Sequence, residues 1–328
     1  MLLRIICIIC EEITFMGRKI IIADEMHPSI VPDLNNAGFE VDYLPEISRE
    51  MLKDCIYQYD GIIIRSKTDL DREMIDLARN LKYIARAGAG TDKIDEPYCN
   101  DKGIAILNAP EGNRDALGEH AIGILLTLLN KIHLSDREIR SSYWNREGNR
   151  GTEIKDKIVG IIGYGNMGSA FAQRLSGFEC RVLAYDKYKK DYGDKYAIPS
   201  DMERLYQEVD ILSFHVPLTE ETLGFYDFDF FNKFKKDLYL VNTARGPILP
   251  LTDLIRLLDT GKILGAALDV LEKEKLGKLT NEENDRFYNL VERDNVVFTP
   301  HVGGWSYESY KRINDVLVRK IVSLHNRN

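Results

Sequence analysis

Short apolar runs recur along the chain and alternate with longer segments of mixed polarity. They lie at residues 18–23, 39–44, 60–64, 81–86 and 103–107, and then at 157–162, 180–185, 209–214, 237–242, 263–269 and 295–299. Each run has the length of one β-strand, and the segments between runs are long enough for helices. Strands that alternate with helices form parallel sheets with helices on both faces, so the pattern predicts an α/β fold.

The run at 157–162 leads directly into a glycine-rich pattern. Residues Gly163-Tyr164-Gly165-Asn166-Met167-Gly168 match G-x-G-x-x-G, and helix-compatible sequence follows them. Gly163 permits a tight turn out of the strand, Gly165 lets a pyrophosphate approach the backbone, and Gly168 lets the helix pack closely on the sheet. The helix N-terminus favours the negative charge of the phosphates. We therefore predict a dinucleotide site that includes these six residues.

Asp186 ends the next apolar run and bears on the choice of cofactor. Its carboxylate can accept hydrogen bonds from both ribose hydroxyls of an adenosine and would repel a 2′-phosphate, which favours NAD over NADP. Lys187, Lys189 and Lys190 follow it, and they leave open a contact between a lysine and a phosphate. NAD is the cofactor that we expect.

The apolar runs form two groups, which a predicted helical stretch from about Ala116 to Ser142 separates. Because the glycine pattern follows the first run of the second group, we predict an inserted cofactor domain at residues 114–301, built on a doubly wound parallel sheet. Residues 16–113 predict a smaller, flavodoxin-like substrate domain, and residues 302–328 contain a helix that can complete it. We expect two Rossmann-like domains with a cleft between them, since ligands collect at the carboxyl ends of parallel strands.

Residues 1–15 precede the first predicted strand. Their apolar run stops at Glu11-Glu12, is too short for a membrane span and is followed by no small-residue cleavage site. We expect Met16 to be the natural start and residues 1–15 to be a poorly ordered extension.

Composition and charge narrow the possible partners. The formal net charge of -8 argues against binding to nucleic acid or to an anionic membrane. The five cysteines are scattered and odd in number, which is typical of a reduced cytoplasmic protein rather than of a disulfide framework. We predict no metal site and a small-molecule substrate.

Three polar residues near the ends of predicted strands are candidates for catalysis. Arg245 and His301 follow the runs at 237–242 and 295–299, and Glu274 follows the run at 263–269. Histidine can take a proton from a hydroxyl group while hydride leaves the carbon, and a carboxylate beside it fixes the tautomer. Arginine binds a carboxylate through its planar fork. Together they predict a proton-coupled hydride transfer.

Each candidate also has a purely structural interpretation. A lone histidine is more often a surface or core residue, and Arg245 could cap a helix. Glu274 lies among the charged residues 272–275, as in a solvent-exposed turn, so composition alone does not select it.

Three segments that follow the glycine pattern carry a resemblance to a known family. They are Asn-Thr-Ala-Arg-Gly at 242–246, Gly-Ala-Ala-Leu-Asp-Val at 265–270 and Thr-Pro-His-Val-Gly-Gly at 299–304. They resemble the D-isomer-specific 2-hydroxyacid dehydrogenase family and, within it, the D-3-phosphoglycerate dehydrogenase branch. The resemblance covers nearly all the chain after Met16.

The resemblance implies roles for individual residues. Arg245 would bind substrate, His301 would be the acid/base and Glu274 would be its partner. One departure is Lys275, because proline commonly follows the glutamate in the family, and this leaves Glu272 as an alternative partner. The further cofactor-binding residues that the resemblance implies are His215, Val216, Pro217, Thr243, Ala244, Asp269, Gly303 and Gly304.

The first domain resembles the family in two substrate loops. The residues implied in substrate binding are Arg65, Ser66 and Lys67 of the R-S-x-T loop, and Ala87, Gly88, Ala89 and Gly90 of a glycine-rich loop. Arg65 and Lys67 together could hold a phosphate on the substrate.

The expected function is therefore the NAD-dependent interconversion of a D-2-hydroxy acid and its 2-keto acid. The favoured pair is 3-phosphoglycerate and phosphohydroxypyruvate in serine biosynthesis, and a hydroxypyruvate/glyoxylate or D-lactate type of reductase is the alternative. A non-catalytic NAD-sensing protein similar to the C-terminal-binding corepressors and a methyltransferase are further alternatives. The apolar helix around residues 118–126 and the family resemblance suggest a homodimer.

Overall fold

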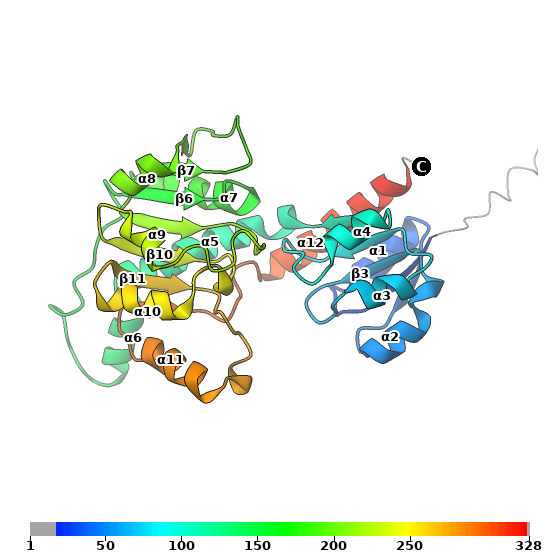
Figure 1. The fold of residues 1–328 in the computed structure, drawn as a ribbon, viewed down its shortest axis with the longest axis horizontal. Helices are drawn as coiled ribbons and strands as arrows, with labels where there is room; N and C mark the ends of the chain where they lie inside the picture. The colour runs from blue at the N-terminus through cyan, green and yellow to red at the C-terminus, as the bar shows by residue number, and fades with distance from the viewer. Residues whose placement is uncertain (1–17, 327–328) are drawn as a thin grey trace, which may run out of the picture. The chain divides into compact units, whose positions relative to one another are not determined.

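A computed structural model describes residues 18–326, so the predicted extension at residues 1–15 lies outside the described part of the chain. The chain divides into two compact units (Figure 1). The first unit comprises Met1–Gly112 and Tyr310–Asn328, and the second comprises Asn113–Ser309.

The first unit contains a five-stranded parallel sheet with the order β2-β1-β3-β4-β5. Its strands are β1 (Lys19–Ile22), β2 (Glu40–Tyr43), β3 (Gly61–Ile64), β4 (Tyr83–Arg86) and β5 (Ala105–Asn108). This is the flavodoxin-like strand order. Each strand lies within or beside one of the apolar runs, and the predicted α/β class is confirmed.

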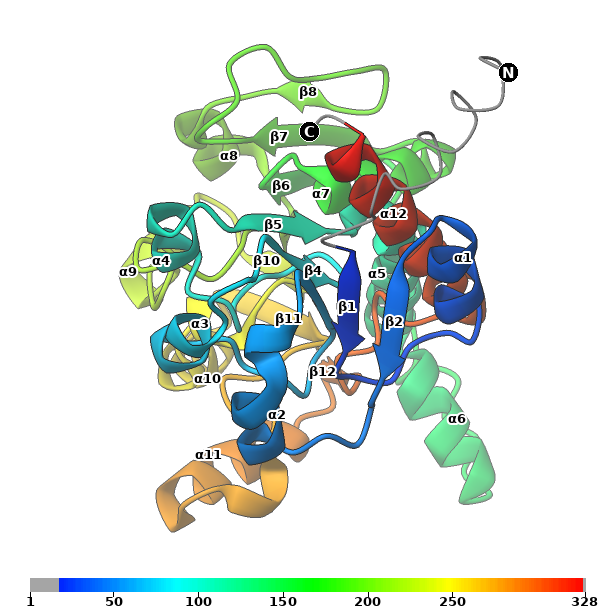
Figure 2. The ribbon, with the colours of Figure 1, turned by 90° about the vertical axis from the view of Figure 1, so that its right-hand side faces the viewer.

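Both faces of this sheet are buried, which explains why its strands are almost continuously apolar. In β1, Ile20 and Ile22 pack into one cluster while Ile21 packs into the other. The first face is covered by α1 (Ile30–Asn36) and α12 (Tyr307–His325), which lie next to each other in Figure 2. The other face is covered by α2 (Arg49–Cys55), α3 (Arg72–Leu77) and α4 (Glu96–Asp101).

The second unit contains a seven-stranded parallel sheet with the order β12-β11-β10-β9-β6-β7-β8. Its strands are β6 (Ile158–Ile162), β7 (Arg181–Tyr185), β8 (Ile198–Pro199), β9 (Ile211–Phe214), β10 (Leu238–Asn242), β11 (Ile263–Leu268) and β12 (Val296–Phe298). Its helices include α7 (Asn166–Leu175), α8 (Met202–Glu208), α9 (Phe228–Asn232), α10 (Leu251–Asp259) and α11 (Asn281–Val291). The edge strand β8 was not predicted, because two exposed residues produce no apolar run.

The helical stretch predicted from Ala116 to Ser142 is two helices, α5 (Pro110–Leu129) and α6 (Ile132–Arg140). Lys131 separates them with a left-handed backbone conformation, φ 50°. No proline or glycine marks this break in the sequence. Although α5 is 20 residues long, neither it nor another helix within residues 18–326 is long and apolar enough to cross a membrane.

The chain re-enters the first unit at Tyr310, eight residues after residue 302, where the sequence pattern predicted this boundary. The intervening residues are bound to the second unit by hydrogen bonds. The backbone amides of Val302 and Gly303 donate to the carboxylate of Asp269 in the second unit. Within the segment itself, the Ser309 hydroxyl donates to the carbonyl of Gly304.

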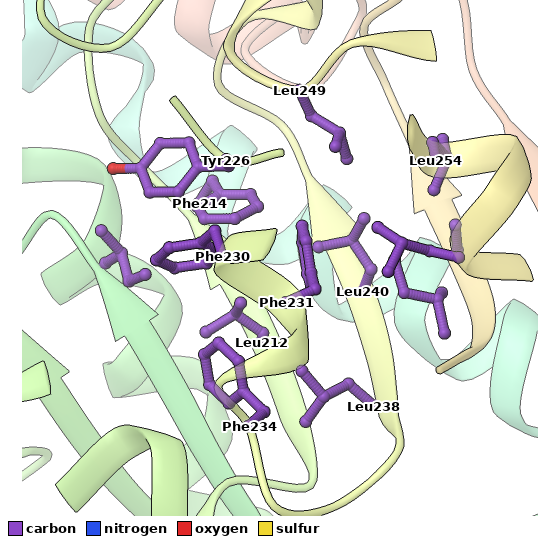
Figure 3. Packing of buried hydrophobic residues seen from close by; sticks show 14 of the residues in the cluster. Leu212, Phe214, Tyr226, Phe230, Phe231, Phe234, Leu238, Leu240, Leu249 and Leu254 are labelled. Carbon is purple, nitrogen blue, oxygen red and sulfur yellow. The ribbon is translucent and has the colours of Figure 1, made fainter. Parts of the chain in front are cut away.

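An aromatic and aliphatic core fixes the strands that carry the candidate site (Figure 3). Phe230 and Phe231 of α9 pack with Phe214 at the end of β9 and with Leu240 in β10. Burying each such side chain contributes about 1.5–3 kcal/mol relative to leaving it exposed. The carboxyl ends of β9 and β10, from which His215 and Arg245 emerge, therefore start from a rigid core.

Candidate active site

His301 and Glu274 form a close side-chain pair at the carboxyl edge of the second sheet. Nδ1 of His301 lies 2.8 Å from Oε1 of Glu274, and the two side chains are 44% and 47% exposed. Glu272, the alternative partner, accepts a hydrogen bond from the backbone amide of Leu251 instead, at 3.0 Å. The geometry therefore pairs His301 with Glu274 and gives Glu272 a place at the start of α10.

The backbone of His301 is held in an unusual conformation by Asp269. His301 has φ 54°, in the left-handed region, which costs on the order of 1 kcal/mol or more for a residue other than glycine. Its amide donates to the carbonyl of Asp269 at 2.8 Å. The next two amides, of Val302 and Gly303, donate to the two carboxylate oxygens of Asp269 at 2.9 and 2.8 Å. These three hydrogen bonds hold the turn at His301 in its left-handed conformation and so fix the position from which the imidazole extends.

The carboxylate of Asp269 is buried, with 2% of the residue exposed, and is fully hydrogen-bonded. Burial by itself raises the pKa of Asp269, but hydrogen bonds from His120, Thr299 and the two amides outweigh it and lower the pKa below its ordinary value. Thr299 Oγ1 donates to Asp269 at 2.6 Å, and His120 Nε2 lies 2.9 Å from the same hydroxyl. Because the hydroxyl gives its one proton to Asp269, it accepts from His120. Nε2 of His120 therefore carries a hydrogen, which faces both this hydroxyl and Oδ1 of Asp269, 3.4 Å from Nε2.

Arg245 lies in a turn that follows β10 and is organised by Asn242. The Asn242 side chain accepts from the amide of Ala244 at 3.0 Å and donates to the carbonyl of Arg245 at 3.2 Å. The next residue is Gly246, where an added Cβ would lie 2.0 Å from the carbonyl carbon of Leu271. Only glycine permits this approach, which brings the Arg245 turn against the loop that continues to Glu274.

The glycine pattern has the geometry that a pyrophosphate requires. Gly163 has φ 93°, and a Cβ there would lie 2.5 Å from the carbonyl oxygen of His215. At Gly168 a Cβ would lie 2.1 Å from the Gly163 oxygen, so the helix packs against the strand end. At Gly165, the N-cap of α7, an added Cβ would meet nothing within 4 Å, and no side chain caps the helix. Space and backbone donors thus coincide at the helix N-terminus, whose first residues are Asn166 and Met167.

Asp186 follows β7 and is bonded to the same turn. Its Oδ2 accepts from the amide of Tyr164 at 2.9 Å, and its Oδ1 accepts from the amide of Lys189 at 3.1 Å. The ammonium of Lys189 donates to the carbonyl of Tyr164 at 2.7 Å, and that of Lys187 pairs with Glu221. These two lysines are therefore engaged by protein groups.

Two buried polar atoms in the predicted cofactor set have no hydrogen-bond partner among residues 18–326. They are Nδ1 of His215 and Oγ1 of Thr243, which follow β9 and β10. Burial lowers the pKa of His215 to about 3, so the ring is neutral, and its Nε2 lies 2.9 Å from Oγ of Ser213. Unpaired buried groups at strand ends fit the polar groups of a bound dinucleotide.

The other predicted cofactor residues lie in the same loops. Val216 and Pro217 continue the chain after His215, and Ala244 is buried before Arg245. A Cβ on Gly303 would lie 2.8 Å from Oδ2 of Asp269, and one on Gly304 would lie 2.4 Å from Nδ2 of Asn113.

The predicted substrate loops lie in the first unit, after the neighbouring parallel strands β3 and β4. Lys67 does not extend from its loop, because its ammonium donates to the carbonyls of Pro45 and Ile47. The guanidinium carbon of Arg65 lies 5.6 Å from the centre of the Tyr310 ring. Of the two cations, Arg65 is the better placed to meet an anion.

The glycine-rich loop is held through its carbonyl groups. The carbonyl of Gly88 accepts from the amide of Ala109, and that of Ala89 accepts from the side chain of Asn108, both at 2.8 Å. In the part of the chain that the structure describes, the amides of Ala89 and Gly90 donate to no protein group. Such amides can bind a carboxylate. Ala87, whose amide donates to the carbonyl of Ile64, ties the loop to β3.

Comparison with known proteins identifies the family. Residues 122–303, more than half of the chain, match the model of the D-isomer specific 2-hydroxyacid dehydrogenase, NAD binding domain. The chain belongs to this family. The resemblance inferred from the sequence is confirmed, and a methyltransferase is excluded.

Individual relatives in the dehydrogenase family differ in their substrates. The chain is 34% identical over 308 residues to a D-3-phosphoglycerate dehydrogenase of Archaeoglobus fulgidus, covering 93% of this chain and 57% of that one. It is 34% identical over 285 residues to a glyoxylate reductase of Thermofilum pendens, covering 84% and 81%. The chain thus spans little more than half the length of that phosphoglycerate dehydrogenase. A solved structure of D-lactate dehydrogenase from Aquifex aeolicus with NAD and lactic acid matches with a TM-score of 0.79 and 25% identity, covering 94% and 95%.

Proposed function

We propose that this protein is an NAD-dependent dehydrogenase that interconverts a D-2-hydroxy acid and its 2-keto acid. The observation that carries the proposal is the 2.8 Å pair of His301 and Glu274, which lies at the carboxyl edge of the same parallel sheet as the glycine turn after β6. Family membership supports it.

In the reduction, His301 donates a proton to the carbonyl oxygen of the keto acid. Nδ1 of His301 faces Glu274, so Nε2 is the atom available to the substrate. A reduced nicotinamide held at the glycine turn would supply the hydride for the carbonyl carbon and would be oxidised in doing so. Glu274 stabilises the imidazolium before the proton leaves and holds the tautomer afterwards. Arg245 binds the substrate carboxylate and orients the carbonyl group.

NAD rather than NADP is the proposed physiological cofactor. Asp186 places a negative charge at the end of β7, and the nearby Lys187 and Lys189 are bonded to Glu221 and Tyr164. A 2′-phosphate would therefore meet the Asp186 carboxylate, and of the three lysines at 187, 189 and 190 only the exposed Lys190 has no bond to a protein group within residues 18–326. Turnover with NADH is expected to exceed turnover with NADPH, and a preference for NADPH would reject this assignment.

For the substrate we propose 3-phosphoglycerate and phosphohydroxypyruvate first. Support comes from Arg65 and from the 34% identity to a phosphoglycerate dehydrogenase. A second candidate is an unphosphorylated 2-keto acid such as glyoxylate or hydroxypyruvate. This is favoured by the engagement of Lys67 with backbone carbonyls and by an equal identity to a glyoxylate reductase over 81% of its length.

One assay separates these candidates. NADH oxidation is measured with phosphohydroxypyruvate, hydroxypyruvate, glyoxylate, pyruvate and a branched 2-keto acid. A kcat/KM for phosphohydroxypyruvate at least tenfold above that for hydroxypyruvate supports the first candidate, and the reverse order supports the second. Binding of NADH without turnover of any keto acid would favour a non-catalytic NAD-sensing protein.

We propose in addition that the protein forms a homodimer through α6 and the segment after it. Ile132 and Ile139 lie seven positions apart on this helix and are both exposed. Tyr143 and Trp144 follow, and Trp144 is 81% exposed. A run of large exposed apolar side chains is typical of a surface that another protein covers, and a second copy of the chain is the partner that we propose.

A further inference from the structure

Asp24 is a buried carboxylate that contacts a single loop. It follows β1, and only 2% of the residue is exposed. Oδ2 accepts from the backbone amides of Arg65 and Lys67 at 2.7 and 2.9 Å, and Oδ1 accepts from Oγ1 of Thr68 at 2.5 Å. All three donors lie in the loop after β3, the strand that pairs with β1. The charge of Asp24 is thus balanced by hydrogen bonds from residues 65–68.

The other residues of this loop differ in how they are held. Lys67 is tied to the carbonyls of Pro45 and Ile47, and Arg65 stacks on Tyr310. Ser66, between the two amides that Asp24 binds, is exposed. Its own amide donates to no protein group within residues 18–326.

We propose that Asp24 is a positioning residue for substrate binding. It holds the amides of Arg65 and Lys67 inward, so that the Ser66 amide and hydroxyl and the Arg65 guanidinium are presented to the anionic groups of a 2-keto acid. The inference rests on the proposed function, because it takes the loop at residues 65–68 as a substrate loop. It adds a residue outside the loop that controls affinity for the keto acid and leaves hydride transfer unaffected.

The chemistry of the three donors predicts an order among variants at this position. In Asp24→Asn, the amide oxygen can still accept from both backbone amides, and the amide nitrogen can donate to the Thr68 hydroxyl, which is able to accept. In Asp24→Ala, three partly buried hydrogen bonds lose their acceptor. In Thr68→Val, only one of the three bonds is lost. A residue required only for its negative charge would instead be impaired equally by asparagine and alanine.

The test compares these variants by steady-state kinetics with the keto acid that gives turnover. We expect KM for the keto acid to rise at least tenfold in Asp24→Ala, by an intermediate factor in Thr68→Val and less than threefold in Asp24→Asn. We expect kcat and the dissociation constant of NADH to stay within about twofold of the wild type, because the dinucleotide residues lie in the second unit. An unchanged KM in Asp24→Ala, or an equal weakening of NADH binding, overturns the proposal.

Asp60→Ala is the matched control. Asp60 is also a hydrogen-bonded carboxylate in the first unit, but it precedes β3 and binds the amide of Lys19 and the ammonium of Lys82. Losing it removes comparable bonds at the amino edge of the same sheet. KM for the keto acid is expected to stay at the wild-type value, and a rise equal to that of Asp24→Ala would reduce the effect to general destabilisation and overturn the proposal.

Hydrogen exchange separates this inference from the proposed function. The amides of Arg65 and Lys67 are expected to be protected in the wild type and in Asp24→Asn, and to exchange at least tenfold faster in Asp24→Ala. If the wild type reduces no keto acid, the proposed function fails while this readout still decides whether Asp24 holds the loop. Equal protection in wild type and Asp24→Ala overturns the positioning role whatever the activity.

Discussion

Nδ1 of His301 and Oε1 of Glu274 lie 2.8 Å apart although nearly half of each side chain is exposed. Even when His301 is protonated, an ion pair so open to solvent contributes about 0–1 kcal/mol to stability. We therefore expect the pair to affect kcat much more than the free energy of unfolding.

Replacing Glu274 by glutamine tests that expectation. The variant Glu274→Gln should lower kcat by roughly 10²-fold, since the imidazolium loses its neighbouring charge and its fixed tautomer. The free energy of unfolding should change by less than about 0.5 kcal/mol. The control is Glu272→Gln, which alters the contact with the amide of Leu251 and should keep kcat. A larger loss of kcat at Glu272 would reverse the assignment.

Thr299 connects the buried Asp269 to His120. In Thr299→Val, the 2.6 Å hydrogen bond to Asp269 is lost, and unfolding experiments should show a loss of about 1–3 kcal/mol. We expect kcat to fall as well, because the left-handed turn at His301 is less firmly held. Thr127→Val removes an exposed hydroxyl from α5 and is the control, with an expected change within about 0.5 kcal/mol. Equal stabilities of the two variants would contradict the network.

Gly246 is expected to tolerate no side chain. In Gly246→Ala the new methyl group would lie 2.0 Å from the carbonyl of Leu271, so the Arg245 turn and the Glu274 loop must separate. Activity should fall at least tenfold, measured at saturating NADH. The matched substitution Gly123→Ala in α5 meets nothing within 4 Å and should stabilise the protein by up to about 1 kcal/mol. Wild-type activity in Gly246→Ala would show that the two loops need not touch.

His215 should make the cofactor-free protein sensitive to acid. Its pKa is lowered to about 3 by burial, against about 6.5 in the unfolded chain, so between these values the unfolded state binds the extra proton. Stability is therefore lost as the pH falls below about 6.5. From pH 6.5 to 5 this residue should cost about 1–2 kcal/mol, which His215→Gln would abolish. Parallel stability curves for the two proteins in urea would refute the assignment.

The proposed dimer surface can be tested by introducing one charged residue into it. Ile139→Glu should convert a particle with twice the 37.6 kDa chain mass into monomers, as measured by light scattering. Met51→Glu changes a somewhat more exposed apolar residue on α2 and should leave the mass unchanged. A monomeric wild type would reject the proposal.

The strands could be predicted because parallel strands buried on both faces read as apolar runs. Residues 61–64 are all buried, and the run at 60–64 predicts them directly. The division between α5 and α6 could not be predicted, because a lysine in a left-handed conformation has no sequence signature. Strand β8 was missed because its two residues are exposed.

Some residues of the site could be predicted from the sequence and others could not. Glu274 was selected only through the family resemblance, since its neighbours are those of a surface turn. The roles of Asp24, Thr299 and His120 were missed, because their hydrogen bonds join residues far apart in the chain. One signal was available: Asp24 and Thr299 are polar residues placed at the ends of strongly apolar strands.

Helix α12 has a consequence for biosynthesis. Its residues Ile313, Val316, Leu317 and Ile321 cover the face of the first sheet that carries Ile20 and Ile22. These residues leave the ribosome after the whole of the second unit. A nascent chain that has just completed the second unit therefore still lacks α12, which covers one face of the first sheet. We expect the unit whose synthesis begins first to complete its core last.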